Sequence, residues 1–137
     1  VFGTIAMFLY PLFWPLLQAL WPQHLQPART DYAGRCEWLL ARGLGLWDVY
    51  ASCEREGSLD SAIRAAQVND FAGLRQRCPD LQLALHNGGE SYKHARQTEA
   101  LGLIALKLPS TSPANAGWSF DRKLQAWHHA LAAHGLL

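Results

Sequence analysis

The amino-acid sequence predicts an α/β domain with a mainly parallel sheet that helices cover on both faces. Two patterns support this fold class. Short apolar runs typical of buried strands alternate with segments of helical periodicity, in the order strand, helices, strand, loop, helix, strand, helix, strand, helix. The stretches between successive strands can hold the right-handed crossovers that parallel strands require. The length of 137 residues fits one domain, so we expect a single domain over residues 1–137.

The first third of the chain contains one strand end and two helices. Residues 1–4 end in Gly3-Thr4 and are typical of the last residues of a buried strand. A short buried helix is expected over residues 13–21, because apolar side chains recur there at helical spacing: Phe13, Leu16, Leu17, Leu20 and Trp21. A second helix is expected between the N-cap Asp31 and Gly43, with four residues facing the core: Tyr32, Cys36, Leu39 and Leu40.

A short apolar run over residues 44–52 predicts a central strand of the sheet. Asp48 interrupts this run. A carboxylate at such a position is costly unless it is hydrogen-bonded, so Asp48 either caps local backbone amides or faces a ligand. The polar stretch over residues 53–63 is expected to be an ordered surface loop that leads into a helical turn.

The second half of the chain alternates helices and strands. Four elements are expected in order: a helix over residues 69–78 capped by Asn69, a strand over 81–87, a helix over 90–100 and a strand over 103–109. The last helix is expected after the N-cap Ser119, with an apolar stripe on its buried face: Phe120, Leu124, Trp127 and Leu131.

A polar loop over residues 108–116 connects the last strand to the last helix. Pro109 and Pro113 restrict its backbone, and three hydroxyl residues and Asn115 accompany them. Ligands of open α/β sheets bind at the carboxyl ends of the strands, so the loop indicates a candidate site there. That edge is expected to gather the loop with Gly3-Thr4, Asp48 and Asn87-Gly88. An ordinary connection between strand and helix is the alternative.

Composition excludes several classes of protein. Twelve Lys and Arg against eleven Asp and Glu give a net charge of +1, so no strong overall field indicates nucleic acid, although a local basic face is compatible with this count. Three cysteines without CxxC spacing indicate a reducing, cytoplasmic setting and no disulfide framework. The histidines lack metal-ligand spacing and the glycine signatures of nucleotide binding are absent, so neither a metal nor a cofactor is expected.

Residues 1–22 carry no charge and have the length of a membrane-spanning segment, which makes a membrane-tethered domain an alternative. Three prolines, Pro11, Pro15 and Pro22, and the lack of flanking basic residues argue against that alternative. We therefore expect no membrane association.

Four segments resemble the hypoxanthine DNA glycosylases, a branch of the uracil-DNA glycosylase superfamily. They are LWDVYASCEREGSLDSAI at residues 46–63, NDF at 69–71, HNG at 86–88 and LPSTSPANAGWSFDRKLQAW at 108–127. The resemblance implies a three-layer αβα fold with a central four-stranded, mainly parallel sheet. It also implies hydrolytic removal of a deaminated base, hypoxanthine or uracil, from DNA. In such enzymes the nucleotide is flipped out of the duplex before water attacks its anomeric carbon.

The resemblance assigns the loop after residue 108 to DNA binding. Ser110 and Ser112 are expected to donate to phosphate oxygens without sequence preference. Thr111 belongs to the same motif, and Asn115 is expected to hold the loop or the opposite strand.

The resemblance also assigns residues to the base and to catalysis. Asp48 occupies the position at which related glycosylases read the base edge, and a carboxylate suits an N–H donor such as N1–H of hypoxanthine or N3–H of uracil. Asn87 is expected to contact the base. Gly3 and Thr4 match the strand end of the catalytic motif. Tyr10 matches an aromatic that stacks on the flipped base, with a core aromatic as the alternative.

The N-terminal part departs from the family pattern. The family has a loop of more than a dozen residues between that strand end and a Phe-Trp-Pro segment, with an asparagine as its catalytic group. Here residues 5–12 alone separate Thr4 from Phe13, and Pro11 stands at the asparagine position. We therefore expect a domain shortened near its N-terminus, with a catalytically inactive DNA-binding relative as the alternative. In both cases the expected partner is DNA that contains a deaminated base, bound by a monomer.

Overall fold

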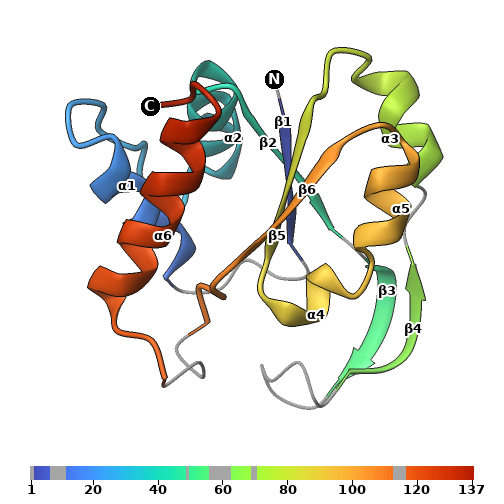
Figure 1. Cartoon of the computed structure of the whole chain (residues 1–137). Coiled ribbons are helices and arrows are strands. Elements are labelled where there is room, and N and C mark those ends of the chain that lie inside the picture. The colour runs from blue at the N-terminus through green and yellow to red at the C-terminus, as the bar shows by residue number, and fades with distance from the viewer. Residues whose placement is uncertain (1, 7–11, 49, 56–62, 69–70, 113–116) are drawn as a thin grey trace.

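The computed structural model describes residues 2–6, 12–48, 50–55, 63–68, 71–112 and 117–137. Its centre is a sheet whose neighbouring strands are all parallel and lie in the order β2-β1-β5-β6 (Figure 1). These strands are β1 (Phe2–Ala6), β2 (Leu44–Asp48), β5 (Leu83–Asn87) and β6 (Ile104–Leu108). The predicted α/β class, with a parallel sheet and covering helices, is confirmed.

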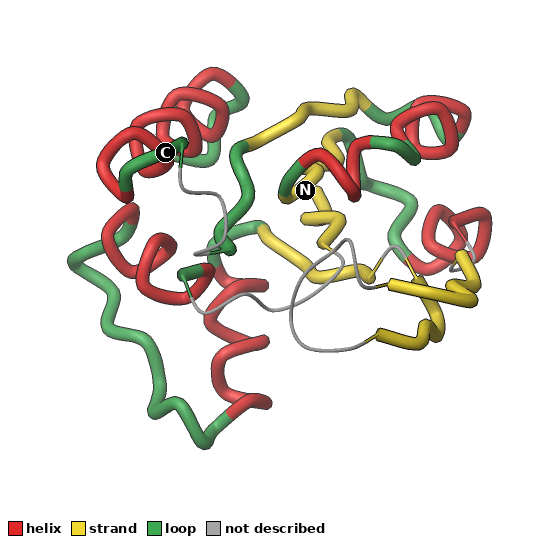
Figure 2. The backbone as a smooth tube through the Cα atoms, turned by 90° about the horizontal axis from the view of Figure 1, so that it is seen from below, coloured by secondary structure: helices red, strands yellow, loops and turns green. Residues whose placement is uncertain are grey.

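Helices lie on both sides of this sheet (Figure 1, Figure 2). One group contains α1 (Phe13–Leu20), α2 (Tyr32–Ala41) and α6 (Phe120–Ala133), and the other α3 (Phe71–Arg77), α4 (Gly89–Tyr92) and α5 (Ala95–Ala100). Leu83 and Leu85 of β5 belong to the core that the first group covers, whereas Ala84 packs in a smaller core with Leu74 of α3. Strand β5 is therefore buried on both faces, as its apolar start predicts.

The predicted helix over residues 13–21 is confirmed as α1. Phe13, Leu16, Leu17 and Leu20 are buried on it, and Trp21 is buried just beyond it. Residues 2–6 lie in the sheet rather than in a helix. In the part of the chain that the structure describes, no helix is long and apolar enough to cross a membrane.

Helix α2 has the predicted cap but not the predicted buried face. The Asp31 carboxylate accepts the N–H of Gly34 at 2.9 Å, and the helix ends before Gly43, whose φ is +82°. Tyr32 and Leu40 are exposed, at 53% and 68%, so their predicted burial is wrong. Trp38 is instead buried on α2: its ring packs edge-on against Trp21, and its Nε1 donates to the carbonyl of His24 at 3.1 Å.

The predicted central strand over residues 44–52 is wrong in two respects. Strand β2 ends at Asp48 and lies at an edge of the sheet. The chain then forms β3 (Tyr50–Arg55), which pairs antiparallel with β4 (Ile63–Val68) in a separate two-stranded sheet. The predicted loop over residues 53–63 is therefore strand at both of its ends. Arg64 and Gln67 interrupt the apolar residues of β4, so no continuous apolar run indicated this hairpin.

The predicted helix over residues 90–100 is two helices, α4 and α5, with a break between Tyr92 and Ala95. A straight helix would separate Ser91 and Thr98 by about 10 Å along its axis. Both hydroxyls instead hydrogen-bond to the one imidazole of His86. The predicted helix over residues 69–78 is α3; its proposed cap, Asn69, lies outside the described residues.

Candidate functional site

The carboxyl ends of the parallel strands meet at one edge of the sheet. Ala6 at the end of β1 pairs with Asp48 at the end of β2, and Asn87 at the end of β5 pairs with Leu108 at the end of β6. The structure therefore brings Asp48, Asn87 and the start of the polar loop to the same edge. Strands β2 and β6 are the two outer strands, so Asp48 and the loop lie three strand spacings apart, about 14 Å.

Gly3 and Thr4 do not lie at a strand end. They pair with β2 on one side and with β5 on the other, and β1 continues to Ala6. The predicted strand end at Thr4 is therefore wrong, because Ile5 still pairs with both neighbours and Ala6 still pairs with Asp48 of β2. Two further predicted site residues, Tyr10 and Asn115, lie outside the described residues.

Asn87 and Thr111 form a buried reciprocal pair. The amide Nδ2 of Asn87 donates to Oγ1 of Thr111 at 2.9 Å, and the backbone N–H of Thr111 donates to Oδ1 of Asn87 at 3.0 Å. Asn87 is 2% exposed and Thr111 is fully buried. Two residues predicted to touch DNA and the base thus bind each other, and this pair joins the end of β5 to the polar loop.

Three further hydrogen bonds hold the loop from residue 109 to 112 against the core. They are Trp127 Nε1 to the Pro109 carbonyl at 3.0 Å, Leu12 N–H to the Thr111 carbonyl at 3.3 Å, and Lys123 Nζ to the Ser112 carbonyl at 2.9 Å. Within the loop, the N–H of Ser112 donates to Oγ of Ser110 at 3.1 Å. Ser110 and Ser112 are half-buried, so both retain a solvent-facing part. Hydrogen bonds to the core therefore hold the loop in place, while its serines remain accessible to solvent.

Lys123 is the residue of this site that the sequence pattern missed. It lies on α6, which has the predicted Ser119 cap, and its side chain is 1% exposed. Burial lowers its pKa from the ordinary value. The expected stripe is correct for Trp127 and Leu131, but Phe120 is 36% exposed. The signal was available, because Lys123 lies four residues before Trp127 and so shares its face.

Gly88 allows the loop to approach β5 closely. Its φ is +98°, a conformation that favours glycine, and a Cβ at this position would lie 3.0 Å from Cβ of Ser110. Its N–H donates to the Leu108 carbonyl at 2.9 Å. The Asn-Gly turn therefore brings two strand ends and the loop into direct contact.

His86 is buried behind this edge. Its Nδ1 lies 2.9 Å from Oγ of Ser91, and its Nε2 lies 3.0 Å from Oγ1 of Thr98. The Thr98 hydroxyl donates to the Ala95 carbonyl, so its oxygen accepts from Nε2–H and Nδ1 accepts from Ser91 in the neutral ring. Burial lowers the pKa of His86 to about 4, a hydrogen bond with the Ser91 backbone opposes part of that shift, and His94 adds to it. The ring is thus neutral at pH 7 and joins β5 to α4 and α5.

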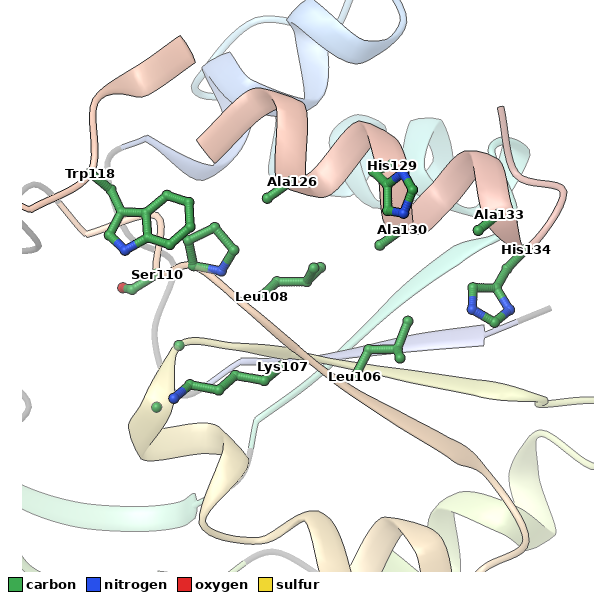
Figure 3. A pocket seen from close by; sticks show the side chains of 13 residues that line it. Leu106, Lys107, Leu108, Ser110, Trp118, Ala126, His129, Ala130, Ala133 and His134 are labelled. Atoms are coloured by element: carbon green, nitrogen blue, oxygen red, sulfur yellow. The ribbon is translucent and has the colours of Figure 1, made fainter. Parts of the chain in front are cut away.

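A cleft of about 800 Å³ begins at the loop and runs between β6 and α6 (Figure 3). Leu106 and Leu108 line it from the strand, and Ala126, Ala130 and Ala133 line it from the helix. Its polar lining consists of Lys107, Ser110, His129 and His134, together with the indole of Trp118. The sequence pattern did not identify this cleft, because it depends on how far α6 lies from β6.

The chain is similar to two curated proteins, each named "Hypoxanthine DNA glycosylase". The protein from Methanosarcina acetivorans is 34% identical over 111 residues, which cover 81% of this chain and 69% of the relative. The protein from Methanosarcina barkeri is 36% identical over 118 residues, which cover 86% of this chain and 73% of the relative. No protein-family model matches the chain.

A solved structure agrees with these relatives. The solution NMR structure of a "putative Uracil DNA glycosylase" from Methanosarcina acetivorans superimposes with a TM-score of 0.74 at 27% identity and covers 93% of this chain and 89% of that one. The identity and the coverage of the curated relatives, together with this common fold, place the chain in a family: it belongs to the hypoxanthine DNA glycosylases.

Proposed function

We propose that this protein is a DNA glycosylase that hydrolyses the N-glycosidic bond of a deaminated nucleotide, hypoxanthine or uracil. The family membership supports this function. The observation that carries it here is the clamped loop, which the Asn87–Thr111 pair and Lys123 hold at the carboxyl edge of the sheet. A loop that hydrogen bonds hold against the core, with accessible serines, can keep DNA in one position relative to Asp48. We take residues 1–137 as one three-layer αβα domain with a four-stranded sheet, acting as a monomer in a reducing compartment.

In this proposal the residues at the carboxyl edge of the sheet have separate roles in binding DNA and the base. Ser110 and Ser112 donate to phosphates and orient the strand without reading sequence. Asp48 accepts the N–H of the flipped base from the end of β2, which favours hypoxanthine and uracil over bases that present an acceptor there. The neutral amide of Asn87 holds the loop through Thr111 rather than contacting the base directly. Water then attacks the anomeric carbon and the base leaves.

Single-turnover base release on duplexes with hypoxanthine, uracil or xanthine tests the function and the role of Asp48. Asp48→Ala is expected to slow release of hypoxanthine and uracil at least tenfold, the value of one hydrogen bond to a charged group. Asp80→Ala, at an exposed carboxylate before β5, is the matched control and leaves the rates unchanged. Rates of Asp48→Ala equal to those of wild type on hypoxanthine and uracil contradict the base-reading role.

The same assay distinguishes an active enzyme from an inactive DNA-binding relative. The inactive relative is the alternative because Pro11 stands at the position of the family's catalytic asparagine. Release of base by the wild-type protein under single-turnover conditions supports the glycosylase. Binding of lesion-containing DNA without any release selects the inactive relative.

The loop serines give a separate prediction about DNA affinity. Ser110→Ala combined with Ser112→Ala is expected to raise the Kd for lesion-containing DNA about tenfold, because two phosphate hydrogen bonds are lost. The check is fluorescence anisotropy at fixed salt, with Thr30→Ala as an exposed hydroxyl control. Thermal unfolding is measured in parallel, since Ser110 also accepts the N–H of Ser112. An unchanged Kd rules out phosphate binding by Ser110 and Ser112.

A further inference from the structure

The loop end of the cleft combines an aromatic face with cations. Trp118 is 38% exposed, and the guanidinium of Arg122 lies over its ring at 4.4 Å from the centroid. Figure 3 shows Trp118, Ser110 and Lys107 around this end of the cleft, with His134 at the far end. The end of the cleft beside the loop therefore presents an indole, a hydroxyl and an ammonium.

Lys107 supplies a cation at this position. Its side chain is exposed on β6, and in the described part of the chain it makes no hydrogen bond or ion pair. Its Nζ would lie 4.0 Å from a Cβ placed on Gly89, so the ammonium lies over the turn that follows Asn87. An anion bound there would also lie near Ser110, which lines the same cleft.

We propose that the loop end of this cleft binds one nucleotide of the substrate DNA that flanks the excised base, with its base on Trp118 and its phosphate at Lys107. The proposal rests on the proposed function, because it assumes DNA as the substrate. It adds a subsite between β6 and α6 to the loop and the Asp48 edge.

Charge and shape favour a nucleotide as the occupant. Among the residues that the structure describes, no Asp or Glu lines the cleft, whereas Lys107, His129 and His134 do. A described lining without acids and with an exposed indole suits an anionic ligand with a flat ring, because bases stack on aromatic side chains and lysine attracts phosphate. A volume of about 800 Å³ is within the range of pockets that enclose small ligands.

Position distinguishes a flanking nucleotide from the flipped base. Asp48 ends β2, the outer strand opposite to β6, about 14 Å away by strand spacing. A base read by Asp48 therefore cannot occupy the β6–α6 cleft. The loop begins at the end of β6 and is bonded through Thr111 to Asn87 at the end of β5, the side on which β2 lies, so one strand of DNA can pass from the Asp48 edge over the loop into the cleft.

The affinity experiment compares two single-stranded substrates, one with hypoxanthine inside a long oligonucleotide and one trimmed to the hypoxanthine nucleotide without neighbours, on which Trp118→Ala is expected to have no effect. Trp118→Ala is expected to raise the Kd for the long substrate about tenfold, and Trp118→Phe to restore most of the affinity. Lys107→Gln is expected to lower the slope of log Kd against log salt by about 0.7. Arg29→Gln, an equal charge loss at an exposed site between α1 and α2, serves as the control.

Photocrosslinking then locates the nucleotide. A 5-iodouracil moved one position at a time along each flank is expected to crosslink to Trp118 from one position. Equal Kd values for Trp118→Ala and wild type on the long substrate overturn the proposal, as does a crosslink to residues outside the cleft from every position. If the wild-type protein releases no base while the crosslink to Trp118 persists, the proposed function fails and the subsite stands.

Discussion

His86→Gln is expected to remove most of a pH dependence of stability that amounts to about 3 kcal/mol between pH 7 and pH 4. The pKa of His86 is about 4 in the folded protein, whereas the ordinary histidine value of 6.5 applies to the unfolded chain. Between these values the unfolded chain binds a proton that the folded chain does not, so the free energy of unfolding falls as the pH falls. Above pH 6.5 the ring is neutral in both states and its contribution is complete.

Chemical denaturation at several pH values measures this effect. The free energy of unfolding of His86→Gln, relative to wild type, is expected to be lowest at pH 7 and to recover by about 3 kcal/mol at pH 4, because only the wild type must exclude a proton. His128→Gln, at an exposed position of α6, is the matched control and keeps the wild-type pH profile. A parallel pH profile for His86→Gln and wild type contradicts the buried neutral ring.

Local patterns predicted the elements that have a clear period and clear ends. Helices α1 and α6 follow from apolar spacing and, for α6, from the Ser119 cap, and strands β5 and β6 follow from apolar runs that end at turns. The edge at which Asp48, Asn87 and the loop meet also follows, because parallel strands place their carboxyl ends together.

The elements that the sequence did not predict depend on partners far along the chain. Hairpin β3–β4 forms by antiparallel pairing of two segments without a continuous apolar run, and the break between α4 and α5 accompanies two hydroxyls bonded to the ring of His86. The buried ammonium of Lys123 is satisfied by the Ser112 carbonyl, eleven residues away. The spacing of apolar residues along the chain does not identify such distant hydrogen-bond partners. Buried polar groups at a site are therefore recognised only from the tertiary structure.

Asn87→Ala is expected to lower the free energy of unfolding by about 3 kcal/mol and to weaken DNA binding at least tenfold. The substitution leaves the N–H and the hydroxyl of Thr111 without partners in a fully buried position, and each unsatisfied group costs about 1–3 kcal/mol. Gln125→Ala, which removes an exposed amide from α6, is the control for loss of an amide side chain and is expected to change neither quantity.

A double-mutant cycle shows whether Asn87 acts through Thr111. Thr111→Val keeps the shape of the side chain but removes its hydroxyl, so it loses one of the two hydrogen bonds. If the amide acts by holding the loop, Asn87→Ala costs less in Thr111→Val than in wild type, with a coupling of about 1 kcal/mol or more in stability and a matching coupling in DNA affinity. Additive losses in DNA affinity, with stability still coupled, assign Asn87 a direct contact with the base instead. The cycle thus decides between the role that the family resemblance implies for Asn87 and the role that its buried hydrogen bonds support.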